Sequence, residues 1–160
     1  MPTPEFLAGE DLPASKLNAL NTIDTSWVPT LAAFATNPDL GSSPSQTSRI
    51  HLVGNLVNVW ATIRFGSGSD PGSGTYQVPL PAAYPLHADL IDHTFGTWRG
   101  LDDSTAGRAS GVVGIGVADQ FFYFRNSEGG TGVASHNIPW TWADGDWIVF
   151  HATYLTDFGT

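Results

Sequence analysis

The sequence contains no cysteine and a single lysine among its 160 residues. Without cysteine, the chain forms no disulfide and offers no thiolate to a metal ion. Six basic residues stand against fifteen acidic ones, which gives a formal net charge of −9. An anionic surface repels phosphate groups, and the sequence has no run of basic residues. We therefore expect neither nucleic acid nor an anionic membrane surface as a partner.

Long apolar runs are also missing. No segment approaches the ~20 consecutive apolar residues that a membrane-spanning helix needs. The opening residues, Met1-Pro2-Thr3-Pro4-Glu5, lack the basic and then apolar order of a signal peptide. We expect a protein that does not insert into a membrane and that is made without a signal peptide.

Recognisable catalytic motifs are absent as well. The glycine-rich run 111–116 does not match the dinucleotide-binding fingerprint, and the loop 66–74 lacks the lysine of a phosphate-binding loop. No Gly-x-Ser-x-Gly elbow supports serine-hydrolase chemistry. The pairs Asp102-Asp103 and Asp144/Asp146 could serve glycoside hydrolysis, but short acidic side chains are more typical of turns. We predict no enzymatic activity and no cofactor, and keep a glycan hydrolase as a remote alternative.

One short segment gathers histidine and carboxylate side chains. Its sequence is His87-Ala88-Asp89-Leu90-Ile91-Asp92-His93, and on a strand His87, Asp89 and His93 would share one face. Two imidazoles and a carboxylate are ligands that a divalent cation accepts. A polar loop whose imidazoles bond to the backbone explains the same residues. We favour that loop, so no metal is predicted.

Most of the chain alternates between apolar and polar residues in the manner of β-strands. Val57, Val59, Ala61 and Ile63 are separated by Asn58, Trp60 and Thr62, so the apolar side chains face one side of a sheet. Clusters of glycine, proline and aspartate divide the strands. Strands are expected at 28–36, 49–53, 56–65, 75–81, 95–100, 111–118, 121–125, 137–141 and 146–154. Without interleaved helices, this order predicts an all-β fold, a jelly-roll-type β-sandwich.

Residues 1–26 differ from the β-domain expected over 27–160. Residues 14–24 are the one segment with helical spacing, because Leu17, Leu20 and Ile23 recur every three residues. A helix this short is marginal alone and needs a surface to pack against. It would cover one end of the sheet or dock on a neighbouring subunit.

Six tryptophans are unusual in a chain of this size. Trp27 and Trp147 begin strand segments and are predicted to anchor the core. The remaining four are candidates for an exposed interface or a glycan contact, because aromatic side chains combine a large contact area with a polar group. These four are Trp60, Trp98, Trp140 and Trp142. A sandwich with a second buried face is the alternative explanation.

Three motifs carry a resemblance to a known group of proteins. The opening Phe6-Leu7-Ala8-Gly9-Glu10 to Leu20 resembles the "F-x-A-G-E-x-L-x-A-x-x-L-N" start of phage tail and fibre subunits. The stretch from Trp27 to Pro81 is similar to a β-module of phage minor tail proteins. The closing segment 142–150 resembles the last strand of trimeric jelly rolls related to tumour necrosis factor. The chain thus resembles exterior virion proteins of tailed bacteriophages, especially actinobacterial ones.

The resemblance implies a non-enzymatic structural protein on the virion exterior, made in the host cytoplasm. It implies a homotrimer whose other partners are virion proteins and a host-surface glycan. The absence of a long shaft favours a compact decoration, spike or tail-tip subunit. The leading prediction is a minor tail or tail-tip subunit, with a capsid decoration protein or a carbohydrate-binding module as alternatives. An attachment role falls to the apolar residues of the N-terminal arm, namely Phe6, Leu7, Leu12, Leu17, Leu20 and Ile23.

Overall fold

The computed structural model describes residues 21–88, 90, 94–116, 120–127 and 132–156. Every regular element in these ranges is a β-strand, which confirms the all-β class. The strands are β1 (Asn21–Asp24), β2 (Ala32–Ala33), β3 (Ser45–Val53), β4 (Leu56–Arg64), β5 (Tyr76–Pro79), β6 (Thr94–Leu101), β7 (Arg108–Gly116), β8 (Phe121–Asn126) and β9 (Trp147–Leu155). No helix in these ranges is long and apolar enough to cross a membrane.

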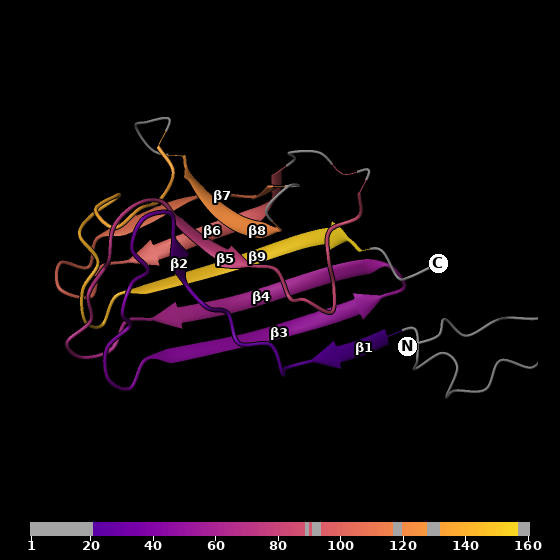
Figure 1. Cartoon of the computed structure of the whole chain (residues 1–160), viewed down its shortest axis with the longest axis horizontal. Helices are drawn as coiled ribbons and strands as arrows, with labels where there is room; N and C mark the ends of the chain where they lie inside the picture. The colour runs from indigo at the N-terminus through magenta and orange to yellow at the C-terminus, as the bar shows by residue number, and fades with distance from the viewer. Residues whose placement is uncertain (1–20, 89, 91–93, 117–119, 128–131, 157–160) are drawn as a thin grey trace, which may run out of the picture.

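The nine strands form one antiparallel sheet in the order β1-β3-β4-β9-β6-β7-β8-β5-β2 (Figure 1). The expected jelly roll would have two separate sheets, and the structure differs on this point. The reason is the position of β9, which pairs with β4 on one side and β6 on the other. This double pairing joins the two halves of the chain into a single, strongly curled sheet.

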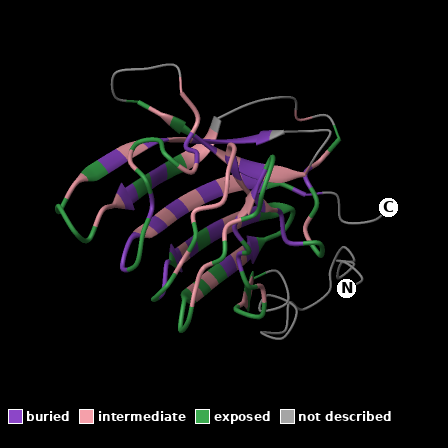
Figure 2. Cartoon of the chain, turned by 60° about the vertical axis from the view of Figure 1, so that its left-hand side comes forward, coloured by how far each residue is buried: buried purple, intermediate pink, exposed green. Residues whose placement is uncertain are grey.

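Strict alternation of burial along β3, β4 and β9 gives the sheet an inner and an outer face. In β4, Val57, Val59, Ala61 and Ile63 are buried, whereas the residues between them are partly or fully exposed. Figure 2 shows the same banding of buried and exposed residues along the strands. Directly paired residues point to the same side of a sheet, so the register carries each face across all the strands. The alternation predicted for β4 and β9 is confirmed.

The curl is filled by aromatic side chains that meet across the inner face. Phe122 and Phe124 of β8 contact Phe150 of β9, with both pairs of ring centroids 5.3 Å apart. Two strands, β6 and β7, lie between β8 and β9 in the sheet. Trp27 then packs on Phe122 from the chain segment before β2. These contacts close the open side of the curled sheet over its own core.

Glycines on the inner side of β6 and β7 make room for this core. A Cβ atom at Gly100 would lie 2.8 Å from the ring of Trp142 and 3.1 Å from the ring of Trp98. A Cβ at Gly111 would lie 1.8 Å from the carbonyl oxygen of Arg125. Because each of these spaces is already occupied, a side chain at either position would displace an indole ring or a neighbouring strand.

The glycine-rich loop 66–74 is paired along its length with the segment 36–42. Backbone bridges join Thr36 to Ser73, Asp39 to Asp70, and Ser42 to Ser67. The approach is close enough that a Cβ at Gly66 would lie 2.1 Å from the carbonyl oxygen of Ser42. The loop is therefore an ordered part of the structure, and it seals the inner face beside Phe65.

Three expected elements differ from the structure. The end of the predicted helix, Asn21–Asp24, is strand β1 and pairs with β3, so the sheet extends to the N-terminal side of the predicted boundary at residue 27. The strand expected over 28–36 shortens to β2. Residues 137–141 form turns and an isolated bridge, because β4 and β6 already occupy both edges of β9. The rest of the predicted helix lies outside the described residues.

A glycine substitution tests the close approach of β7 and β8. Gly111→Ala should lower the free energy of unfolding by about 1–3 kcal/mol, because its Cβ collides with the backbone of β8. Gly132→Ala is the matched control, since its Cβ would meet nothing closer than 3.9 Å. Urea unfolding followed by tryptophan fluorescence measures both. Equal stability of the two variants would contradict the packing described for Gly111.

Candidate functional site

The outer face of the sheet carries an apolar patch at the end where β3 turns into β4. The patch consists of Ile23, Val53, Leu56 and Leu155, which are between 36% and 55% exposed. The tight turn Gly54-Asn55 sets Val53 opposite Leu56, and Leu56 in turn lies opposite Leu155. Ile23 pairs with His51 on the same face. A contiguous exposed apolar surface of this kind marks a site of interaction.

Trp60 lies on the same outer face toward the centre of the sheet, and the polar pair Asn58 and Thr153 separates it from this patch. Its ring stacks on His151 of β9, with centroids 5.1 Å apart and an interplanar angle of 27°. Arg49 and Thr97 flank the stack in the same cross-strand row. Trp60 is 44% exposed, as its outward position in the alternation predicts. Its role in an interface or glycan contact stays a prediction.

The structure corrects the predictions for three other tryptophans. Trp98 and Trp142 are each 1% exposed, and each indole N–H donates to a backbone carbonyl, so neither is available to a partner. Both indole rings fit in the core because Gly100 has no side chain in the space that they occupy. Trp140 is half-buried against Trp142. Trp147, expected in the core, is half-buried on the outer face because its register sets it between Arg64 and Leu101. Trp27 is half-buried and packs on the core, as predicted.

All the arginines of the chain lie on this outer face. They come from five different strands and are Arg49 on β3, Arg64 on β4, Arg99 on β6, Arg108 on β7 and Arg125 on β8. Each occupies an exposed, outward position in the register. Arg125 also lies over the ring of Tyr123, 5.0 Å from its centroid. Sequence reasoning missed this cluster, because its members are far apart along the chain.

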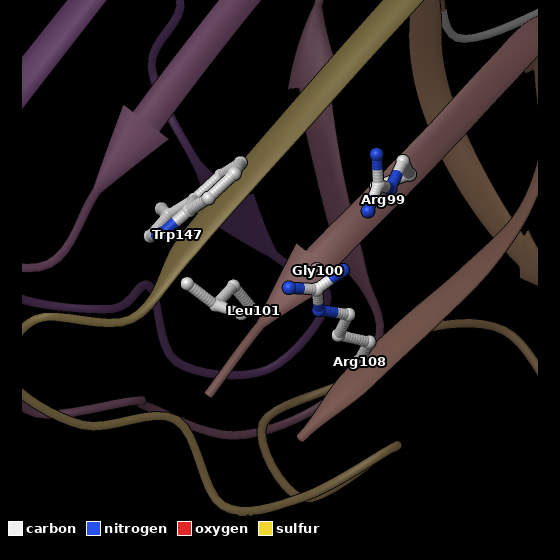
Figure 3. Close-up of a pocket in the computed structure, with 5 residues that line it drawn as sticks. All are labelled: Arg99, Gly100, Leu101, Arg108 and Trp147. Atoms are coloured by element: carbon white, nitrogen blue, oxygen red, sulfur yellow. The ribbon is translucent and has the colours of Figure 1, made fainter. Parts of the chain in front are cut away.

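Two of the arginines border a shallow depression at the end of β6. Its lining residues are Arg99, Gly100, Leu101, Arg108 and Trp147. Figure 3 shows Arg108 extending from the start of β7 across the end of β6 toward Gly100. Leu101 and Trp147, which are directly paired, supply an apolar floor beside the guanidinium groups. The depression combines positive charge with apolar surface, a composition suited to an anionic partner.

One carboxylate of each aspartate pair considered for hydrolysis is engaged in loop structure, Asp102 in one pair and Asp146 in the other. Asp146 is 1% exposed and accepts hydrogen bonds from the backbone N–H groups of Asp103 and Ala143 and from the indole N–H of Trp140. Burial raises the pKa of Asp146, while these hydrogen bonds oppose the shift. Asp102 accepts bonds from Ser104 and Thr105, whose hydroxyls lower its pKa. Both carboxylates therefore have a structural role, because each holds a turn together through these hydrogen bonds.

The candidate metal ligands are only partly described. His87 lies in a described turn, where its backbone N–H donates to the carbonyl of Leu155. Asp89 and His93 lie outside the described residues, as do the arm residues Phe6, Leu7, Leu12, Leu17 and Leu20. Among the residues that are described, no group of three or more histidine or acidic side chains could hold a metal ion.

Comparison with known proteins gives a likeness at the level of fold. No family model and no curated protein matches the chain. Among solved structures, the crystal structure of the Dettilon tailspike protein is similar, with a TM-score of 0.56 and 16% sequence identity. The similarity covers 86% of this chain and 24% of that chain, so this chain spans about a quarter of the tailspike's length. The described residues thus define an all-β protein whose fold resembles part of a tailspike.

Tryptophan substitutions test the division between core and surface. Trp98→Ala should cost about 3–5 kcal/mol of unfolding free energy, because it leaves a cavity against Phe124 and removes the hydrogen bond from the indole N–H to the Arg125 carbonyl. Trp60→Ala removes a ring of similar size from the outer face and should cost less than about 1 kcal/mol. Chemical denaturation measures both values, and a cost for Trp60→Ala matching that of Trp98→Ala would overturn the assignment.

The buried carboxylate of Asp146 makes a pH-dependent contribution. Its pKa is raised on folding, so its contribution to stability falls as the pH rises from the ordinary value of 3.8 through the folded-state pKa. Asp146→Asn removes this titration and sets an amide N–H against a backbone or indole donor, at a cost of about 1–3 kcal/mol. The stability difference between wild type and variant should therefore narrow with rising pH. A difference that widens in urea unfolding between pH 4 and pH 7 contradicts this sign.

Proposed function

We propose that the protein is a non-enzymatic structural subunit of a tailed-phage virion, exposed on the particle exterior as a minor tail or tail-tip component. The fold likeness to a tailspike over most of the chain supports this proposal. The sequence resemblance to phage tail subunits supports it independently. One carboxylate of each candidate catalytic pair, Asp102 or Asp146, is hydrogen-bonded within a turn, which favours a structural role over hydrolysis.

The working form of the protein is a homotrimer, and the apolar patch supplies part of the contact between its subunits. Ile23, Val53, Leu56 and Leu155 are already partly buried, so covering each contributes about 1 kcal/mol. A stable contact buries roughly 800 Å² on each partner, which is more than four partly exposed side chains provide. The contact must therefore extend along the outer face past Trp60.

The N-terminal arm attaches the subunit to other virion proteins in this proposal. Ile23, first assigned to the arm, belongs to β1 and is better placed to act within the apolar patch. In this proposal the subunit also contacts a glycan on the host surface. Trp60 is the proposed contact residue, because it is 44% exposed. Immunogold labelling of intact particles should decorate the tail. Label confined to the capsid would instead assign the protein to capsid decoration.

A charge placed in the apolar patch tests self-association. Leu155→Glu should convert a particle of three times 17.0 kDa into a monomer, because a carboxylate in an apolar contact is strongly disfavoured. Val28→Glu is the matched control, since Val28 is 56% exposed and lies outside the patch. Light scattering over a concentration series measures the mass. A wild-type chain that stays monomeric would refute the trimer.

A further inference from the structure

Charge is strongly segregated on this protein. The chain carries a net charge of −9, yet every one of its arginines points outward from the sheet. None of the described aspartates shares that face. Asp24 pairs with the buried Ile50 and so points to the inner side, and the other described aspartates lie in loops. The outer face is therefore locally cationic on an anionic molecule.

The cationic end of this face is formed by Arg64, Arg99 and Arg108, which we call the arginine surface. Within the ranges that the structure describes, no hydrogen bond or ion pair engages the side chains of Arg99 and Arg108. Arg64 donates only to the carbonyl oxygen of Gly145, at 3.4 Å. Arginine is enriched at protein interfaces and lysine is depleted there, which matches a surface built without lysine.

The complementary charge lies on the loops at the same end of the sheet. These loops follow β4 and β6 and precede β3 and β9, and they gather at the left-hand end of the sheet in Figure 1. They carry Asp39, Asp70, Asp102, Asp103 and Asp144, which we call the acidic loop end. Asp39 and Asp70 are fixed by hydrogen bonds to the backbone of Gly41 and Gly72. The lowered pKa of Asp102 keeps its carboxylate charged.

We propose that the arginine surface of one copy binds the acidic loop end of the next copy. The proposal rests on the homotrimer proposed above and specifies how its subunits are oriented. A contact between two different surfaces of the same chain is heterologous, and three such contacts form a closed ring when neighbouring copies are related by a rotation of one third of a turn. The arginine surface and the apolar patch lie at opposite ends of the same outer face, with Trp60 and His151 between them, so one extended face serves the whole contact.

Electrostatics favours a second copy over other anionic partners. Chains that each carry −9 repel one another, and self-association requires a local attraction that offsets this repulsion. Arginines facing preformed turn carboxylates supply that attraction and fix the register of the contact.

Charge reversal with rescue tests the proposal on the full-length chain. Arg99→Glu/Arg108→Glu should raise the concentration at which half of the protein is trimeric at least about tenfold at low salt. Arg99→Lys/Arg108→Lys is the matched control and should remain trimeric, because the charge is kept. Adding Asp103→Arg/Asp144→Arg to the reversed variant should restore the trimer, since neither aspartate side chain makes a hydrogen bond within the described residues. Sedimentation velocity measures assembly, and thermal melting confirms that each variant is folded.

The outcomes separate this proposal from the one on which it rests. A wild-type monomer overturns both. A trimer that persists in the folded Arg99→Glu/Arg108→Glu variant overturns the arginine contact and leaves the trimer standing. Loss of assembly without rescue also overturns the pairing with the acidic loop end. A further outcome concerns immobilised alginate, an acidic polysaccharide. If wild type binds alginate and the Arg99→Glu/Arg108→Glu variant stays trimeric but does not bind it, the arginine surface serves an acidic polysaccharide instead.

Discussion

The contact of Phe122 and Phe124 with Phe150 is the constraint on which the rest of the structure depends. These side chains belong to β8 and β9, which are separated by two strands, and they can meet only if the sheet bends sharply between them. The bend is possible because Gly100 and Gly111 carry no side chain on the inner side of β6 and β7, which leaves room there for the rings of Trp98 and Trp142. Aromatic burial and strand curvature therefore require each other in this fold.

Filling the inner face leaves the outer face for function. A two-sheet sandwich can enclose a ligand between its layers, but here that space holds Trp98, Trp142 and the phenylalanine cluster. What remains accessible is a broad, gently shaped surface of arginine, tryptophan and aliphatic side chains. Such a surface suits contact with another macromolecule, in keeping with a structural role in an assembly.

Local patterns in the sequence predicted the strands well, because alternation is a local property. The ends of β4 and β9 were predicted to within one residue, and the inward face of β4 followed from its residues alone, whereas Trp147 was wrongly expected to face the core. The single curled sheet did not, since it depends on β9 pairing with β4 and β6, far away in the sequence. The burial of Trp98 and the gathering of the arginines share this cause. Helical spacing misled at Asn21–Asp24, where pairing with β3 outweighs a weak local preference.

The central place of β9 has a consequence for how the protein is made. The ribosome synthesises Trp147–Leu155 after every other described strand, yet this segment forms the seam between β4 and β6. Without β9, the strand order permits only two separate half-sheets, β1-β3-β4 and β6-β7-β8-β5-β2. The arginines of β3 and β4 and those of β6 to β8 then belong to different half-sheets. In the proposed trimer, the arginine surface is complete only after β9 has joined β4 to β6, so contact between subunits would follow the synthesis of β9.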